Sequence, residues 1–133
     1  MTVGRLNDPM PRGGDAKAVR VDRATALGNP YVVRRHDSLS VRHAACAAYR
    51  ELLSRRDVWD GDGETVVAIG EAHGFRGEVR SWRAERAVER LAEITAMARQ
   101  GRLRLDCSCA PLECHAWAIA ERVMEDLAMA GGM

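Results

Sequence analysis

Hydrophobic residues recur at helical spacing in three segments of the chain. An apolar stripe at every third or fourth position predicts helices over residues 40–55, 79–100 and 114–130. Ser38 or Ser40 is suited to cap the first helix. Its stripe consists of Val41, Ala44, Ala45, Ala48, Tyr49, Leu52 and Leu53. We expect this stripe to pack the helix onto a sheet.

Between these helices, other segments have the composition of strands. Residues 16–23 and 102–107 alternate between apolar and polar positions, as half-buried strands do. Residues 31–33 are apolar and follow a turn, and residues 64–69 are rich in β-branched side chains, which favours a buried strand. Strands that alternate with helices predict the α/β class. We therefore expect a small single three-layer domain whose largely parallel sheet is flanked by about three helices.

Length and composition set the domain organisation. A chain of 133 residues forms one hydrophobic core, and 47% hydrophobic with 29% charged residues excludes a mostly disordered chain. Glycine and proline are frequent in residues 1–15, which predicts a flexible N-terminal tail. We assign residues 16–133 to the single α/β domain.

Charge and hydropathy limit the partners. The formal net charge of +1 excludes a generally basic nucleic-acid coat, although a local basic patch remains compatible with it. All basic residues except Lys17 are arginines, which reflects either coding bias or the bidentate binding of anions. No segment is apolar enough to span a membrane or to serve as a signal peptide, so we expect a cytoplasmic protein without a membrane partner.

The cysteine loop, residues 107–115, contains the highest concentration of reactive or metal-binding residue types in the chain. Cys107, Cys109, Cys114 and His115 follow a predicted strand and open a predicted helix. In a cytosolic chain these thiols are not expected to form disulfides. Four soft or borderline ligands match a tetrahedral zinc site, although Cys114 and His115 are adjacent and point in different directions. A zinc site is therefore one interpretation.

A reactive thiol is the second interpretation. Cys109 and His115 would then act as catalytic nucleophile and partner, because a helix N-terminus lowers the pKa of a thiol. The placement resembles the cradle of cysteine phosphatases and rhodanese-like proteins, with His115 in place of the closing arginine. In the third interpretation the cysteines are small buried core residues.

Two motifs together resemble domain of unknown function family 4326, a set of small proteins from bacteriophages and bacteria. The first motif is Arg23 followed by Gly28-Asn29-Pro30-Tyr31, with Arg42 and Tyr49 on the next helix; the second is Cys-x-Cys-x-Pro-x-x-Cys-His at 107–115. The resemblance spans residues 19–125. It implies a compact α/β fold and no known activity, and its phage setting suggests nucleotide or nucleic-acid metabolism, or interference with host defence. Against the family pattern, residues 57–80 look like an insertion, and Ala116 replaces a frequent glycine.

In a parallel sheet, the loops after the first and last strands lie at one edge. Ligand-binding residues Arg23, Asn29 and Arg42 would then line one cleft with Cys109 and His115. This set suits a nucleotide or other phosphate-bearing ligand, whether a small molecule or a nucleic acid, and would suit an enzyme of nucleotide metabolism. The alternative is a zinc-stabilised module that binds a protein partner, related to phage or defence. In a third hypothesis the chain blocks a host protein and binds no small ligand.

Overall fold

The computed structural model describes residues 2–5, 17–21, 25, 27–34, 36–55, 63–101, 103–107 and 115–131. Three short strands, β1 (Thr2–Arg5), β2 (Lys17–Arg20) and β3 (Leu103–Cys107), form one sheet. The helices are α1 (Leu39–Ser54), α2 (Gly63–Ala72), α3 (Ala84–Gln100) and α4 (His115–Gly131). Together they make a small mixed α/β domain.

The sheet is parallel throughout the described strands. Its order is β1-β3-β2, so the last strand in sequence occupies the centre. Val3 and Val19 are both in register with Leu105, and Gly4 and Arg20 are both in register with Asp106. The expected parallel sheet is confirmed, and the carboxyl ends of all three strands share one edge.

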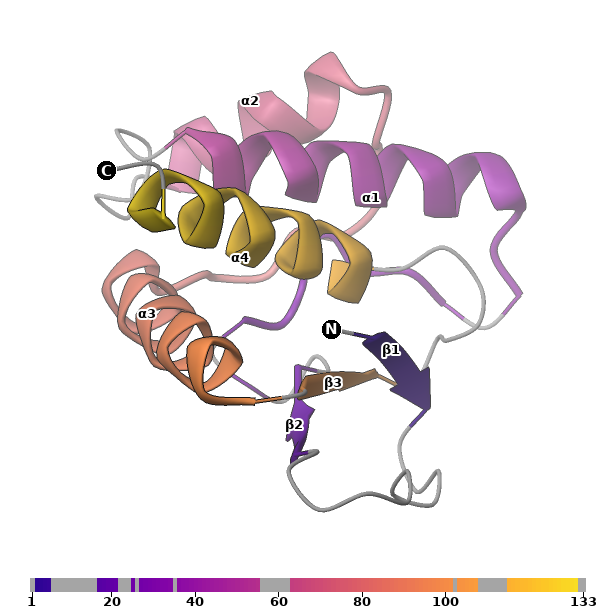
Figure 1. Ribbon diagram of the computed structural model, residues 1–133. Helices are drawn as coiled ribbons and strands as arrows, with labels where there is room; N and C mark the ends of the chain where they lie inside the picture. Colours follow the sequence, from indigo (N-terminus) through magenta and orange to yellow (C-terminus); the bar gives the residue numbers. More distant parts are fainter. Residues whose placement is uncertain are drawn as a thin grey trace.

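The helices stack in a different order from the one we expected. The main contacts between helices and strands are those of α4, which packs against β1 and β3. Helix α1 packs on α4 and α2, so α4 lies between α1 and the sheet (Figure 1). The prediction that α1 packs on the sheet is wrong, and four helices are present where about three were expected. Helices flanking both faces of the sheet are not observed among the described residues.

Residues 64–69 form part of helix α2, and the prediction of a strand is wrong. Val66 and Ile69 are buried, whereas Val67 and Ala68 between them are exposed, which is the spacing of one helical face. A short run of β-branched residues cannot by itself distinguish the two structures. Because Val66 and Ile69 belong to the main core, the described part of segment 57–80 is integral to the fold.

Two element boundaries also differ from the prediction. Helix α3 begins at Ala84 instead of residue 79, because Tyr31 and Val79 form an antiparallel bridge before it. The expected flexible tail begins with a strand, since Thr2–Arg5 pairs with β3. Residues 6–16 lie outside the described part of the chain.

The central strand β3 is buried on both faces. Leu103 and Leu105 enter the hydrophobic core, whereas Arg104 and Asp106 occupy the alternate positions. The Arg104 guanidinium donates from Nε and Nη2 to the two carboxylate oxygens of Asp106, at 2.7 and 3.0 Å. This bidentate pairing offsets the cost of burying both charges.

Gly70 gives a first test of the packing. A Cβ atom at Gly70 would lie 2.7 Å from Cε1 of the buried Tyr31 ring. We expect Gly70→Ala to lower the free energy of unfolding by about 1–3 kcal/mol, although alanine favours a helix over glycine by about 1 kcal/mol. Chemical denaturation measures the change.

Gly74 is the matched control. It ends α2 at a φ of 82°, and a Cβ there would meet nothing within 4 Å. Gly74→Ala should therefore cost only the left-handed backbone strain, about 1 kcal/mol. A Gly70→Ala variant as stable as the wild type would mean that α2 does not pack on Tyr31 as described.

Candidate functional site

The Gly-Asn-Pro loop is clamped onto helix α1. Residues Leu27–Tyr31 are all buried. The Tyr49 hydroxyl donates to the backbone carbonyl of Leu27 at 2.6 Å, and Asn29 Nδ2 donates to the carbonyl of Ala45 at 3.4 Å. Asn29 Oδ1 accepts from the backbone N–H of Tyr31 at 2.9 Å. Both ends of the Asn29 carboxamide are thus engaged within the fold, so Asn29 positions this loop.

Arg42 lies in the first turn of α1. Ser38 caps the helix as predicted, because its Oγ accepts from the backbone N–H of Val41 at 3.4 Å. Arg42 is partly buried, and its side chain makes no hydrogen bond or ion pair with any described residue. A guanidinium without a partner beside a helix N-terminus favours the binding of an anion.

Helices α1 and α4 run side by side in the same direction (Figure 1). Arg50 Nε of α1 and Glu121 Oε2 of α4 form an ion pair at 2.9 Å, so these two residues lie opposite one another on the two helices. Counted back from this pair, Arg42 lies about 12 Å along α1 and His115 about 9 Å along α4, at about 1.5 Å per residue. Arg42 and the first residue of α4 therefore stand within one helical turn of the same level.

The carboxyl ends of the strands reach the same end of the molecule. Cys107 ends β3, where it is in register with Arg5 at the end of β1, and α4 begins at His115 after the cysteine loop. Arg20 ends β2 and is exposed. We call the carboxyl ends of the three strands, together with the starts of α1 and α4, the strand-end site; its backbone positions are Arg5, Arg20, Arg42, Cys107 and His115.

The structure places only some of the predicted site residues. Arg42 lies near the start of α1, Cys107 ends β3, the backbone of His115 begins α4, and Asn29 holds the loop before α1. Arg23, Cys109 and Cys114 lie outside the described residues. The predictions for these three residues stay predictions.

The family model described as "Domain of unknown function (DUF4326)" matches residues 10–125 of the chain. The chain belongs to the DUF4326 family. No curated protein and no solved structure matches it. The matched region includes both the Gly-Asn-Pro loop and the cysteine loop of this DUF4326 chain.

Arg5 and Arg20 are the site residues that sequence reasoning missed. Glycine and proline in residues 1–15 predict a tail, and the alternation in residues 16–23 predicts only a strand, so the local pattern singles out neither arginine. The signal was the short run Thr2–Arg5, which pairs with Arg104–Cys107 in the DUF4326 chain. That pairing joins opposite ends of the sequence and is not visible in local periodicity.

The described part of the DUF4326 chain shows no cluster of metal-binding side chains. The described residues contain no group of three or more His, Cys, Asp or Glu side chains that could hold a metal ion. Cys46 is buried in α1, as expected for a core residue. The described residues include no helix long and apolar enough to cross a membrane.

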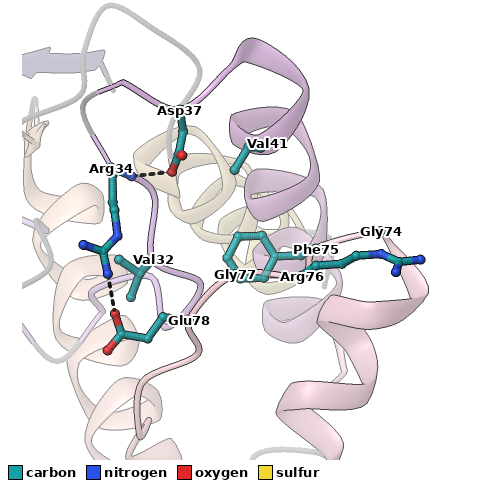
Figure 2. A pocket seen from close by; sticks show the side chains of 9 residues that line it. All are labelled: Val32, Arg34, Asp37, Val41, Gly74, Phe75, Arg76, Gly77 and Glu78. Atoms are coloured by element: carbon teal, nitrogen blue, oxygen red, sulfur yellow. Dashed lines mark hydrogen bonds and ion pairs between the residues drawn. The ribbon is translucent and has the colours of Figure 1, made fainter.

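A second feature of the DUF4326 chain is a hollow of about 390 Å³ between the start of α1 and the segment after α2. Val32, Val41 and Phe75 supply its apolar wall (Figure 2). Polar groups surround this wall: Arg34 Nη2 pairs with Glu78 Oε2 at 3.2 Å, and the Arg34 backbone N–H donates to Asp37 Oδ2 at 2.7 Å. The hollow therefore combines an apolar surface with several hydrogen-bonding groups.

Proposed function

We propose that this protein binds a nucleotide or another small phosphate-bearing ligand at the strand-end site, in a cytoplasmic setting. The observation that carries the proposal is the parallel packing of α1 and α4, in which Arg50 pairs with Glu121. It sets the starts of α1 and α4 at about the same level, and the first N–H groups of a helix have no partner within that helix. Helix α4 packs against β1 and β3, whose carboxyl ends share one edge of the sheet. Ligands of open α/β sheets bind at this edge.

Positive charge at this edge suits a phosphate group. Arg42 is partly buried and has no partner among the described residues, and Arg20 is exposed at the end of β2. The guanidinium of an arginine remains charged throughout the physiological range and presents paired donors to phosphate oxygens. Arg42 is accordingly the ligand-binding residue that we assign first, and we assign Arg23 the same role from its place in the sequence before Asn29.

Catalysis at the site would use Cys109 and His115. A thiolate opposite a helix N-terminus is stabilised by the helix dipole, and a histidine at the first helical position is suited to proton transfer. We therefore extend the proposal to an enzyme of nucleotide or nucleic-acid metabolism, with Cys109 as nucleophile and His115 as general acid. Asn29, whose carboxamide is engaged, acts only by positioning the loop.

A zinc-stabilised interaction module is the alternative proposal. Cys107 at the end of β3 and His115 at the start of α4 stand at the two ends of the cysteine loop. Together with Cys109 and Cys114 they offer the ligand types that structural zinc prefers. In that case the cysteine loop holds the fold together and a helix surface binds a protein partner. About one zinc ion per chain after purification without chelator would favour this alternative.

A thermal-shift experiment tests the phosphate proposal. Inorganic phosphate should raise the Tm of the wild type, and Arg42→Gln should abolish most of this rise. Arg55→Gln is the matched control, since Arg55 caps the opposite end of α1 and pairs with Glu51. An equal phosphate response in wild type, Arg42→Gln and Arg55→Gln would contradict the proposal.

The same thermal-shift experiment tests the contribution of His115 to anion binding. Sulfate keeps its charge between about pH 6 and pH 8, whereas a histidine with an ordinary pKa is cationic only near the lower value. The rise in Tm with sulfate should therefore be larger near pH 6 in the wild type. His115→Ala should remove this pH dependence while Arg42 retains part of the response.

A further inference from the structure

The described arginines differ in whether their side chains pair with acidic residues. Six of the described arginines form ion pairs with acidic residues: Arg34, Arg50, Arg55, Arg90, Arg104 and Arg122. Four others are exposed, lie close together in sequence, and have side chains that make no hydrogen bond or ion pair with a described residue. We call these four the arginine ladder: Arg76, Arg80, Arg83 and Arg86. The ladder therefore presents permanent positive charge directly to solvent.

The ladder has a fixed backbone. It starts after Gly74 at the end of α2 and continues along an extended segment into the first turn of α3. Hydrogen bonds hold that segment to the core: Val32 N–H donates to the carbonyl of Glu78 at 3.0 Å, and Arg80 N–H donates to the carbonyl of Pro30 at 2.8 Å. Trp82 is partly buried and packs against the core between Arg80 and Arg83.

Length and charge favour a polyanion as the ligand of the ladder. At about 3.3 Å per extended residue, the segment from Arg76 to Arg83 spans up to about 23 Å. Residues 76–86 carry four arginines against Glu78 and Glu85, whereas the whole chain has a net charge of only +1. Glu78 is moreover neutralised by Arg34. Four exposed guanidinium groups along a segment of this length can contact successive backbone phosphates.

The hollow at the start of the ladder favours a single strand. Arg76 is one of its lining residues, and its side chain extends away from Phe75 (Figure 2). An unstacked base can enter an apolar hollow with polar walls, whereas the bases of a duplex stay stacked. We infer that the arginine ladder binds the sugar–phosphate backbone of a single-stranded nucleic acid, with one base in the hollow beside Arg76. This inference does not depend on a ligand at the strand-end site.

Fluorescence anisotropy with a labelled oligothymidylate of about 12 nucleotides tests the inference. The wild type should bind it, with log Kobs falling against log salt at a slope of about −2 to −3 for three or four phosphate contacts. The affinity of the triple variant Arg76→Gln/Arg80→Gln/Arg86→Gln should be lower by at least about tenfold. The slope of its log Kobs against log salt should be smaller in magnitude by about 2. A duplex of the same length should bind more weakly than the single strand.

The matched control removes the same charge elsewhere. Arg50→Gln/Arg55→Gln/Arg99→Gln alters three exposed arginines outside the ladder and should leave oligonucleotide affinity within about twofold of the wild type. Equal losses in the two triple variants would overturn the inference, as would a wild type that does not bind at low salt. Stronger binding of the duplex would also overturn it. Displacement of the oligonucleotide by polyglutamate at equal charge would show a surface for acidic proteins instead.

Different measurements test the strand-end site and the arginine ladder. The ladder variant should keep the full rise in Tm with inorganic phosphate, because the strand-end site is intact. Arg42→Gln should keep the oligonucleotide affinity of the wild type. A ladder variant that loses the phosphate response together with oligonucleotide binding would overturn the assignment of two separate sites.

Discussion

Replacing Ala48 with aspartate should destabilise the protein by at least about 3 kcal/mol. Ala48 lies in the middle of α1 and is fully buried. Helices α2 and α4 pack against α1, so the new carboxylate would be placed among apolar side chains without a hydrogen-bonding partner. Because the native state of a small domain is only about 5–15 kcal/mol more stable than the unfolded state, this loss should be visible as a large drop in Tm.

Ala92→Asp is the control for this substitution. Ala92 lies in the middle of α3 and is exposed, so aspartate there loses the helix propensity of alanine without burying a charge. The expected cost is about 0.5–1 kcal/mol. The difference between the two variants isolates the burial of α1. Equal stabilities in denaturant titrations would mean that the buried face of α1 has been assigned wrongly.

The second large effect is alkaline unfolding driven by the two tyrosines of the chain, both of which are fully buried. Burial raises the pKa of Tyr49, and burial together with the charge of Glu51 raises the pKa of Tyr31, well above the ordinary value of 10.0 for both. Above about pH 10 the unfolded chain loses phenolic protons that the folded chain retains. Stability should then fall by about 1.4 kcal/mol per pH unit for each tyrosine. Below about pH 10 both states keep these protons, so this contribution to stability does not change there.

Tyr49→Phe separates this effect from other alkaline titrations. The variant loses the hydrogen bond to Leu27, which should cost about 1 kcal/mol at neutral pH. Above about pH 10 its stability should fall less steeply than that of the wild type, by about 1.4 kcal/mol per pH unit. Phenolate absorbance should appear in the wild type only as the protein unfolds. Phenolate formation near pH 10 in the folded protein would show that the tyrosines are not buried as described.

Local patterns predicted the elements whose residues interact mainly with sequence neighbours. Helix α1 and its Ser38 cap follow from the apolar spacing, and β3 follows from the alternation at Leu103 and Leu105. The run Thr65–Ile69 was ambiguous, because the choice of helix depends on Val66 and Ile69 entering a core shared with distant residues. Strand β1 was missed because its partner is at the other end of the chain.

The features of the candidate site also differ in whether local sequence patterns predict them. From βα order alone, the sequence predicts that Arg23, Asn29, Arg42, Cys109 and His115 line one cleft at the end of a parallel sheet, and of these Arg23 and Cys109 lie outside the described residues. The sequence does not show that the carboxamide of Asn29 forms hydrogen bonds with Tyr31 and Ala45, because Asn29 and Ala45 are sixteen positions apart. Nor does it show which arginines are paired. The ladder stands out only once the ion pairs of the other arginines are known.

A two-dimensional ¹H–¹⁵N NMR titration with inorganic phosphate tests the central proposal most directly. The backbone amides at the strand-end site, including those of Arg42, Cys107 and His115, should shift in a saturable manner. Amides at the far ends of α1 and α4, such as those of Arg55 and Leu127, should stay in place. The absence of saturable shifts at Arg42 and His115, or shifts confined to the arginine ladder, would contradict a phosphate site at the end of the sheet.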